Sequence, residues 1–156
     1  LNATEWAGPA TNPPLTNGAG FWIRSPTGAP ASLRVVLMGK VVADTQTINI
    51  IKTNGLNLIC YPLSSSIGIH QTDFYNDGAT PGKVVPTCDK IQTWTNYGPS
   101  YLMYYLITNS PPTNVGWRTG LSGALSSNTL KISEGFWYTP KKPFSWSETN
   151  RYPGSL

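Results

Sequence analysis

The sequence is poor in charge and in histidine, and this scarcity removes whole classes of protein from consideration. Charged residues make up 12% of the 156 residues, and there is one histidine. An ordinary soluble domain carries about 25% charge. Eleven Lys and Arg against seven Asp and Glu residues give a net charge of +4. The basic residues are scattered almost singly, whereas nucleic-acid-binding proteins cluster theirs. We therefore expect no nucleic-acid partner.

Long apolar runs and helical periodicity are also missing. No stretch approaches the roughly 18 apolar residues of a membrane-spanning helix, and no window keeps an unbroken apolar pattern at helical spacing. We expect no membrane insertion and almost no helix. Glycine and proline are abundant instead, at 15 and 14 residues. Short β-rich runs recur between these turn formers, which is the pattern of an all-β protein.

The fold predicted by this pattern is all-β, a β-sandwich or barrel-like domain of about 8–11 short antiparallel strands. Asn54-Gly55 separates two alternating segments within residues 48–60, and Asn-Gly is the strongest short hairpin signal. A second hairpin is expected over residues 89–109, with its turn at 96–100. Its second strand, 101–107, is apolar on both faces, which predicts a central strand that is covered on both sides.

A short motif, Leu-x-x-x-x-Gly-Phe-Trp, occurs twice at an offset of 115 residues. Its residues are Leu15, Gly20, Phe21 and Trp22 in the first copy, and Leu130, Gly135, Phe136 and Trp137 in the second. A long run of predicted strands precedes the second copy, and nothing comparable precedes the first. The chain is therefore predicted to begin part-way through a repeat unit, with a truncated half repeat followed by a full one.

This repeat predicts the domain organisation. Residues 1–14 are expected to form an extended N-terminal arm, and residues 15–156 a single β domain. Within that domain a half repeat, 15–45, packs on a full repeat, 46–150, because such units bury their apolar faces against neighbours. The arm is the predicted element of contact between molecules. Its candidate contact residues are Asn2, Thr4, Trp6 and Pro9.

Cysteine is scarce, with Cys60 and Cys88 as the two residues present. An even number in a chain of extracellular composition favours a disulfide, which would add roughly 3.5 kcal/mol by closing the loop. Two free buried thiols are the alternative. The chain begins with Leu1, which suggests a removed signal peptide or an arbitrary start. A metal site is not expected with one histidine and no Cys-x-x-Cys.

Candidate catalytic residues do not form a recognisable set. His70 is near Ser64–Ser66 and Asp73 in sequence, without the motifs that mark hydrolase triads. Residues 73–78 gather oxygen ligands but lack calcium-loop spacing, so a turn held by Asn and Asp side chains is favoured. A pair of facing carboxylates, as glycosidases need, stays open. We expect neither an enzyme nor a cofactor.

Aromatic residues are plentiful, with six Trp, eight Tyr and four Phe. A surface row of them would stack on sugar rings, because each ring offers a large rigid apolar face. The candidates for such a row are Trp94, Tyr97, Tyr101 and Trp117. Core and interface packing also uses aromatic side chains, and we favour that interpretation.

A resemblance adds to this interpretation. The motif Leu-x-x-x-Glu-Gly-Phe-Trp, with "NGLNLICYP" upstream and an "IQTW" strand between, resembles a family of uncharacterised, secreted, all-β bacterial repeat proteins. The resemblance runs from about Leu15 to Trp146. The first copy departs from the motif, because Ala19 stands where the second has Glu134. The resemblance implies a cell-surface or extracellular module without catalytic activity, and it assigns no functional residue.

The function expected from these features is structural. We expect a non-catalytic secreted protein whose partners are copies of itself, in an extracellular filament, sheath or surface layer. Strand addition through the N-terminal arm would join the copies. The alternative is a carbohydrate-binding or adhesive module that binds surface glycans through exposed aromatic side chains.

Overall fold

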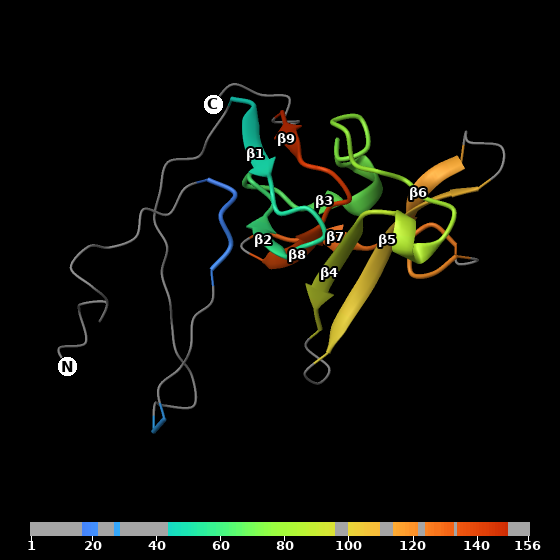
Figure 1. Ribbon diagram of the computed structural model, residues 1–156. Coiled ribbons are helices and arrows are strands. Elements are labelled where there is room, and N and C mark those ends of the chain that lie inside the picture. The colour runs from blue at the N-terminus through green and yellow to red at the C-terminus, as the bar shows by residue number, and fades with distance from the viewer. Residues whose placement is uncertain are drawn as a thin grey trace.

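The computed structural model describes residues 17–21, 27–28, 44–95, 100–109, 114–121, 124–132 and 134–149. Within these residues the chain forms nine β-strands and two single turns of 3₁₀-helix (Figure 1). The elements are β1 (Gln46–Ile50), β2 (Asn57–Cys60), β3 (Ile67–Gly68), η1 (Ile69–Gln71), η2 (Val85–Thr87), β4 (Lys90–Trp94), β5 (Tyr101–Asn109), β6 (Asn114–Arg118), β7 (Thr129–Leu130), β8 (Gly135–Thr139) and β9 (Phe144–Glu148). The predicted all-β fold is confirmed.

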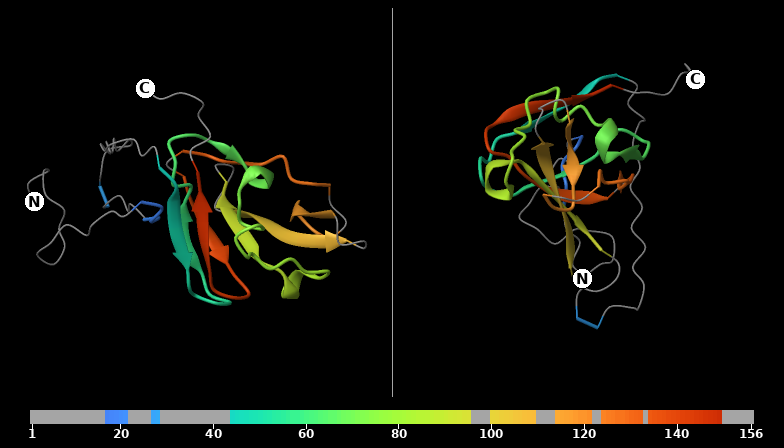
Figure 2. Two further views of the ribbon diagram at one scale, coloured as in Figure 1. Left: turned by 90° about the horizontal axis from the view of Figure 1, so that it is seen from above. Right: turned by 90° about the vertical axis from the view of Figure 1, so that its right-hand side faces the viewer.

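The strands pair antiparallel in three sheets that pack together as in a β-sandwich. A five-stranded sheet has the order β2-β8-β4-β5-β6, while β1 pairs with β9 and β3 pairs with β7. One face of the large sheet shares a continuous apolar core with side chains of both small sheets. Figure 2 shows this arrangement from two further directions. The core thus lies between the large sheet and the two strand pairs that cover it.

Residues 48–60 do not form the hairpin that Asn54-Gly55 predicts. The turn itself is present, because Asn54 has a φ of +54° and Gly55 N–H donates to Lys52 O at 3.0 Å. The strands on either side go to different sheets, since β1 pairs with β9 and β2 pairs with β8. The predicted pairing of these two strands with each other is therefore wrong.

A matching bend elsewhere in the chain explains the difference. Residues 140–143 separate β8 from β9, and Asn54 N–H donates to Pro140 O at 2.8 Å, so the two bends lie together. The β1–β2 and β8–β9 segments therefore form one antiparallel ribbon that turns a corner between two sheets, a known way of joining packed sheets. Asn57 holds the inside of the corner, because its side chain bonds both the N–H and the C=O of Lys52.

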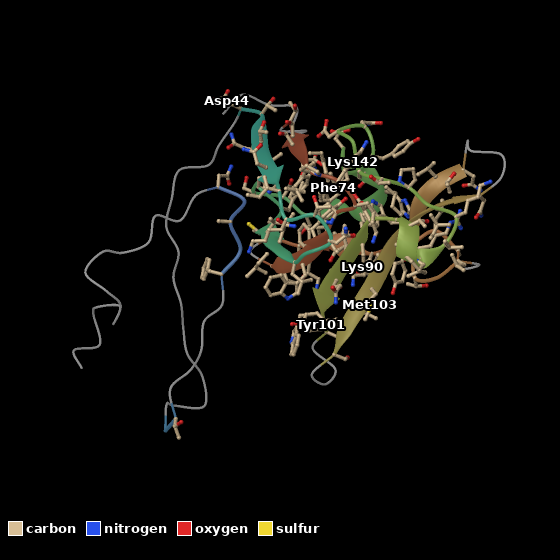
Figure 3. All side chains as sticks on the ribbon, in the orientation of Figure 1. Asp44, Phe74, Lys90, Tyr101, Met103 and Lys142 are labelled. Atoms are coloured by element: carbon tan, nitrogen blue, oxygen red, sulfur yellow. The ribbon has the colours of Figure 1, made fainter. Side chains whose placement is uncertain are left out.

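Phe74 is the centre of the core. Its fully buried ring stacks on Trp146 of β9, with 4.0 Å between centroids, and on Tyr138 of β8, with 4.8 Å. Trp117 and Phe136 meet the same ring edge-on. Because Trp146 belongs to a small sheet and Tyr138 to the large one, Phe74 joins the two sheets (Figure 3).

The loop that carries this phenylalanine is held on β9 by two reciprocal hydrogen bonds. Asp73 N–H donates to the Glu148 carboxylate at 2.8 Å, and Ser147 N–H donates to the Asp77 carboxylate at 2.6 Å. The Asn76 side chain also donates to Asp73 at 3.1 Å. The favoured interpretation of this segment as a turn held by Asn and Asp side chains is confirmed.

A second buried carboxylate, that of Asp89, fixes the corner of the ribbon. Asp89 accepts hydrogen bonds from Lys141 N–H at 2.7 Å, Tyr138 OH at 2.9 Å and Thr80 N–H at 3.0 Å. Lys141 lies in the bend between β8 and β9, so these bonds tie the bend to the residue before β4. Burial raises the pKa of Asp89, and the three hydrogen bonds act in the opposite direction.

The strand pairing of the second predicted hairpin is confirmed, because all five residues of β4 pair with β5. Residues 96–99 of its predicted turn lie outside the described residues. β5 also pairs with β6, so it is an interior strand of its sheet, as its two-sided apolar pattern predicts. Coverage changes along the strand. Leu106 and Ile107 are buried, whereas Leu102 and Met103 are exposed, so the expectation of cover on both faces is correct for one half of β5.

Cys60 and Cys88 are free, so the predicted disulfide is wrong. Cys60 ends β2 opposite Gly135, whereas β4, which starts two residues after Cys88, pairs Lys90 with Thr139 on the other edge of β8. Gly135 and Thr139 are four residues apart along β8, which corresponds to about 13 Å. Cys60 and Cys88 lie at least this far apart in the direction of the strand. A disulfide joins Cα atoms within roughly 7 Å. Burial raises the pKa of both thiols.

Replacing Phe74 by Ala should lower the free energy of unfolding by about 3–5 kcal/mol, because it leaves a cavity between the two sheets. Urea unfolding followed by tryptophan fluorescence measures the change. The matched control is Tyr75→Ala at the next residue, which is 48% exposed and should change stability by about 0.5 kcal/mol or less. Equal effects of the two substitutions would contradict the central position of Phe74.

Candidate functional site

A short segment from the first copy of the repeated motif pairs with the outer edge of β2 through a single isolated bridge. Residues 17–21, here called the docking strand, run antiparallel to β2 and appear in blue beside it in Figure 1. The pairing consists of an Ala19↔Ile59 bridge and two hydrogen bonds, from Cys60 N–H to Gly18 O at 2.9 Å and from Gly20 N–H to Leu58 O at 3.3 Å.

Two glycines allow this close approach. A Cβ added to Gly18 would collide with the side chain of Ile48, and one added to Gly20 would lie 2.6 Å from Leu58 Cγ. Gly18 also has a φ of +77°, a conformation that side chains disfavour. Because Ile48 belongs to β1 and Leu58 to β2, the docking strand contacts both sheets beside the corner of the ribbon. The Asn17 side chain adds a hydrogen bond to that of Gln46.

β2 therefore lies between the two copies of the motif. The Gly-Phe-Trp part of the second copy lies in β8 and places Gly135 opposite Cys60, whereas its Leu130 lies in β7. The first copy forms the docking strand and places Gly20 beside Leu58. Both copies run antiparallel to β2, so they are parallel to each other, with a register that differs by two residues. One strand thus accepts the same short motif on each of its edges.

The two copies differ in burial. Leu130 and Phe136 of the second copy are in the core, whereas Phe21 of the first copy is 41% exposed. Leu15 and Trp22 lie outside the described residues. The second copy is therefore a core strand, while the first is attached at the margin of the sheet.

The outer face of the large sheet carries aromatic and apolar side chains toward solvent. Trp94 of β4 and Tyr101 of β5 are cross-strand partners, and their rings meet edge-on with 5.0 Å between centroids. Gln92 lies between Trp137 and Met103 in a row that crosses β8, β4 and β5. Trp94 is 41% exposed and Met103 42%. Figure 3 shows Tyr101 and Met103 along the projecting part of the hairpin.

Two of the four aromatic residues proposed for sugar stacking lie together on this face, namely Trp94 and Tyr101. Trp117 does not, because β6 turns it into the core and leaves it 3% exposed, so its assignment to a surface row is wrong. Tyr97 lies outside the described residues. Sequence reasoning missed Trp137 as a member of the row, since the strand register that places it there is a long-range property.

His70, the one histidine of the sequence, has the cationic side chain of Arg118 near it. Burial lowers the pKa of His70, the charge of Arg118 acts in the same direction, and hydrogen bonds with the backbone of Ser126 and Trp117 oppose both. Asp73, which is near this histidine in sequence, contributes to the loop on β9. Among the residues that the structure describes, no three His, Cys, Asp or Glu residues lie together as a metal site would require.

The predicted arm residues Asn2, Thr4, Trp6 and Pro9 lie outside the described residues, as does most of the half repeat 15–45. The division of the chain into an arm and a β domain therefore stays a prediction. Searches for similar proteins found no family model, no curated protein and no solved structure that matches the chain. No helix in the described part is long and apolar enough to cross a membrane.

Replacing Gly18 by Val should detach the docking strand from β2. A branched side chain at this φ costs about 1–2 kcal/mol, and it would also collide with Ile48. The reporter is the Cys60 amide, which would lose its acceptor and exchange its hydrogen about tenfold faster or more. Gly120→Ala is the matched control, because a Cβ there meets nothing within 4 Å. Unchanged exchange at Cys60 in Gly18→Val would contradict the pairing.

Proposed function

We propose that this chain is a non-catalytic structural protein whose copies assemble, by β-strand addition, into an extracellular filament, sheath or surface layer. The observation that supports the proposal is the edge of β2, which is complementary to a short strand from a distant part of the sequence. Backbone pairing at a sheet edge is a general way in which one protein binds a segment of another.

The geometry of such a contact favours open-ended assembly. A donated strand and an accepting edge are different surfaces, so the contact between copies is heterologous and continues until a ring happens to close. Monomeric β proteins often protect their edges with charged side chains. Charged residues are 12% of this sequence, and the docking strand itself contains none.

The extracellular location depends on composition and on the resemblance to secreted β repeat proteins. Low charge with many turn-forming residues supports it. The cysteines do not, because both are free, and disulfides are the feature that marks an oxidising compartment.

The intact protein at micromolar concentration should form regular filaments or sheets in electron microscopy. Light scattering should give a mass far above the 16.9 kDa of one chain. Deleting residues 1–21 should leave monomers, because it removes the predicted contact arm together with the docking strand. Deleting residues 152–156 is the control and should leave assembly intact. A 16.9 kDa species at every concentration would sink the proposal.

A carbohydrate-binding or adhesive module is the second candidate, and the exposed Trp94–Tyr101 pair favours it. Ring stacking on these side chains should shift the tryptophan fluorescence when soluble oligosaccharides are added. Trp94→Ala should weaken binding by about tenfold or more, by analogy with interface aromatics. Leu121→Ala, an exposed apolar side chain outside this row, is the control. No fluorescence change across a panel of neutral oligosaccharides would reject the candidate.

A further inference from the structure

We propose that the docking strand is exchanged between copies, so that residues 17–21 of one molecule pair with the β2 edge of the next. The inference rests on the proposed assembly and deepens it, because it names the segment and the edge that join two subunits.

The docking strand is attached by few bonds. Two backbone hydrogen bonds to β2, a long bond of 3.8 Å from the Cys60 thiol to Ala19 O and one side-chain bond from Asn17 to Gln46 hold it, and Phe21 is 41% exposed. Its release leaves the four residue pairs between β2 and β8 in place. The acceptor edge therefore survives as a formed strand when its partner leaves.

The chain is long enough to reach a neighbour. Twenty-two residues separate Phe21 from Asp44, where the described chain resumes before β1. Fully extended, such a segment spans at most about 75 Å, whereas a domain of this size has a radius of gyration of about 15 Å. The Asn17 side chain donates a hydrogen bond to that of Gln46, so the docking strand and the start of β1 lie side by side. A neighbouring edge is thus within reach.

Every contact of the docking strand can be reproduced between molecules. The energy difference between the two arrangements then depends on loop closure and concentration rather than on new contacts. Exchange is therefore favoured at high local concentration, as in a secreted layer, and assembly should rise steeply with concentration.

Two other strand edges are capped within the described residues, which directs the proposal to β2. On the outer edge of β6, Ser126 N–H donates to Trp117 O at 2.8 Å, beside an Arg118↔Leu125 bridge. On β9, the Ser147 N–H donates a hydrogen bond to the Asp77 carboxylate. The β2 edge differs from both, because the backbone that covers it comes from a segment distant in the sequence.

A complementation experiment tests the exchange in the full-length chain. Gly18→Val disables the docking strand and leaves the β2 edge intact. Cys60→Pro removes the N–H that donates to Gly18 O, and it leaves the docking strand intact. Proline is tolerated at such a position, where the N–H points outward from an edge strand. At a concentration where the unmodified protein assembles, each variant alone should stay monomeric. Their equimolar mixture should give a heterodimer, identified by native mass spectrometry.

The outcomes separate the exchange from the assembly that it explains. If the unmodified protein assembles but the mixture stays monomeric, the exchange is overturned and subunits join elsewhere. If the unmodified protein is always monomeric, both proposals fall. Gly120→Ala mixed with Gly18→Val is the control, and its chains should still assemble. If near-ultraviolet circular dichroism shows that Cys60→Pro is unfolded, Leu58→Phe replaces it. The Leu58 side chain lies close against Gly20, so a larger side chain at position 58 should block the docking strand.

Discussion

The stacking of Phe74 between Trp146 and Tyr138 is the contact on which the rest of the structure depends. One neighbouring ring comes from the β1–β9 sheet, the other from the large sheet, and Phe74 itself comes from a loop. Aromatic pairs contribute beyond their buried area, and here three rings bridge two layers. The loop bonds of Asp77 and Glu148 matter because they keep Phe74 in that position.

This packing also determines where a strand can be added. The ribbon must turn a corner to place Tyr138 on one side of Phe74 and Trp146 on the other. β1 and β2 consequently separate into different sheets, and the outer edge of β2 has no partner from its own ribbon. The docking strand occupies that edge, with its glycines against Ile48 and Leu58. The candidate site is thus a consequence of the way the core is closed.

Local patterns predict much of this fold and little of its pairing. Alternation predicts strands at the positions of β1, β2, β4 and β5, and the turn chemistry of Asn54-Gly55 predicts the bend there. Both signals depend only on residues that are neighbours in the sequence. The partner of β2 and the separation of the cysteines depend on register across distant segments. The central position of Phe74 in the core is not predicted either, because turn-forming residues surround it in the sequence and it belongs to no alternating segment. The surface row fails at Trp117 because alternation alone does not say which face is inner.

The surfaces proposed for the two candidate functions, the β2 edge and the aromatic row on the large sheet, meet at Leu58. Leu58 faces Gly20 of the docking strand, and it also stands opposite Trp137 in the row that crosses the large sheet. A change at Leu58 therefore disturbs both surfaces. Gly18 and Trp94 do not have this ambiguity, because Gly18 packs against Ile48 and Trp94 packs against Tyr101 at the end of β4. If strand exchange and sugar binding both occur, substitutions at these two positions should act independently, since energetic coupling requires contact or a shared network.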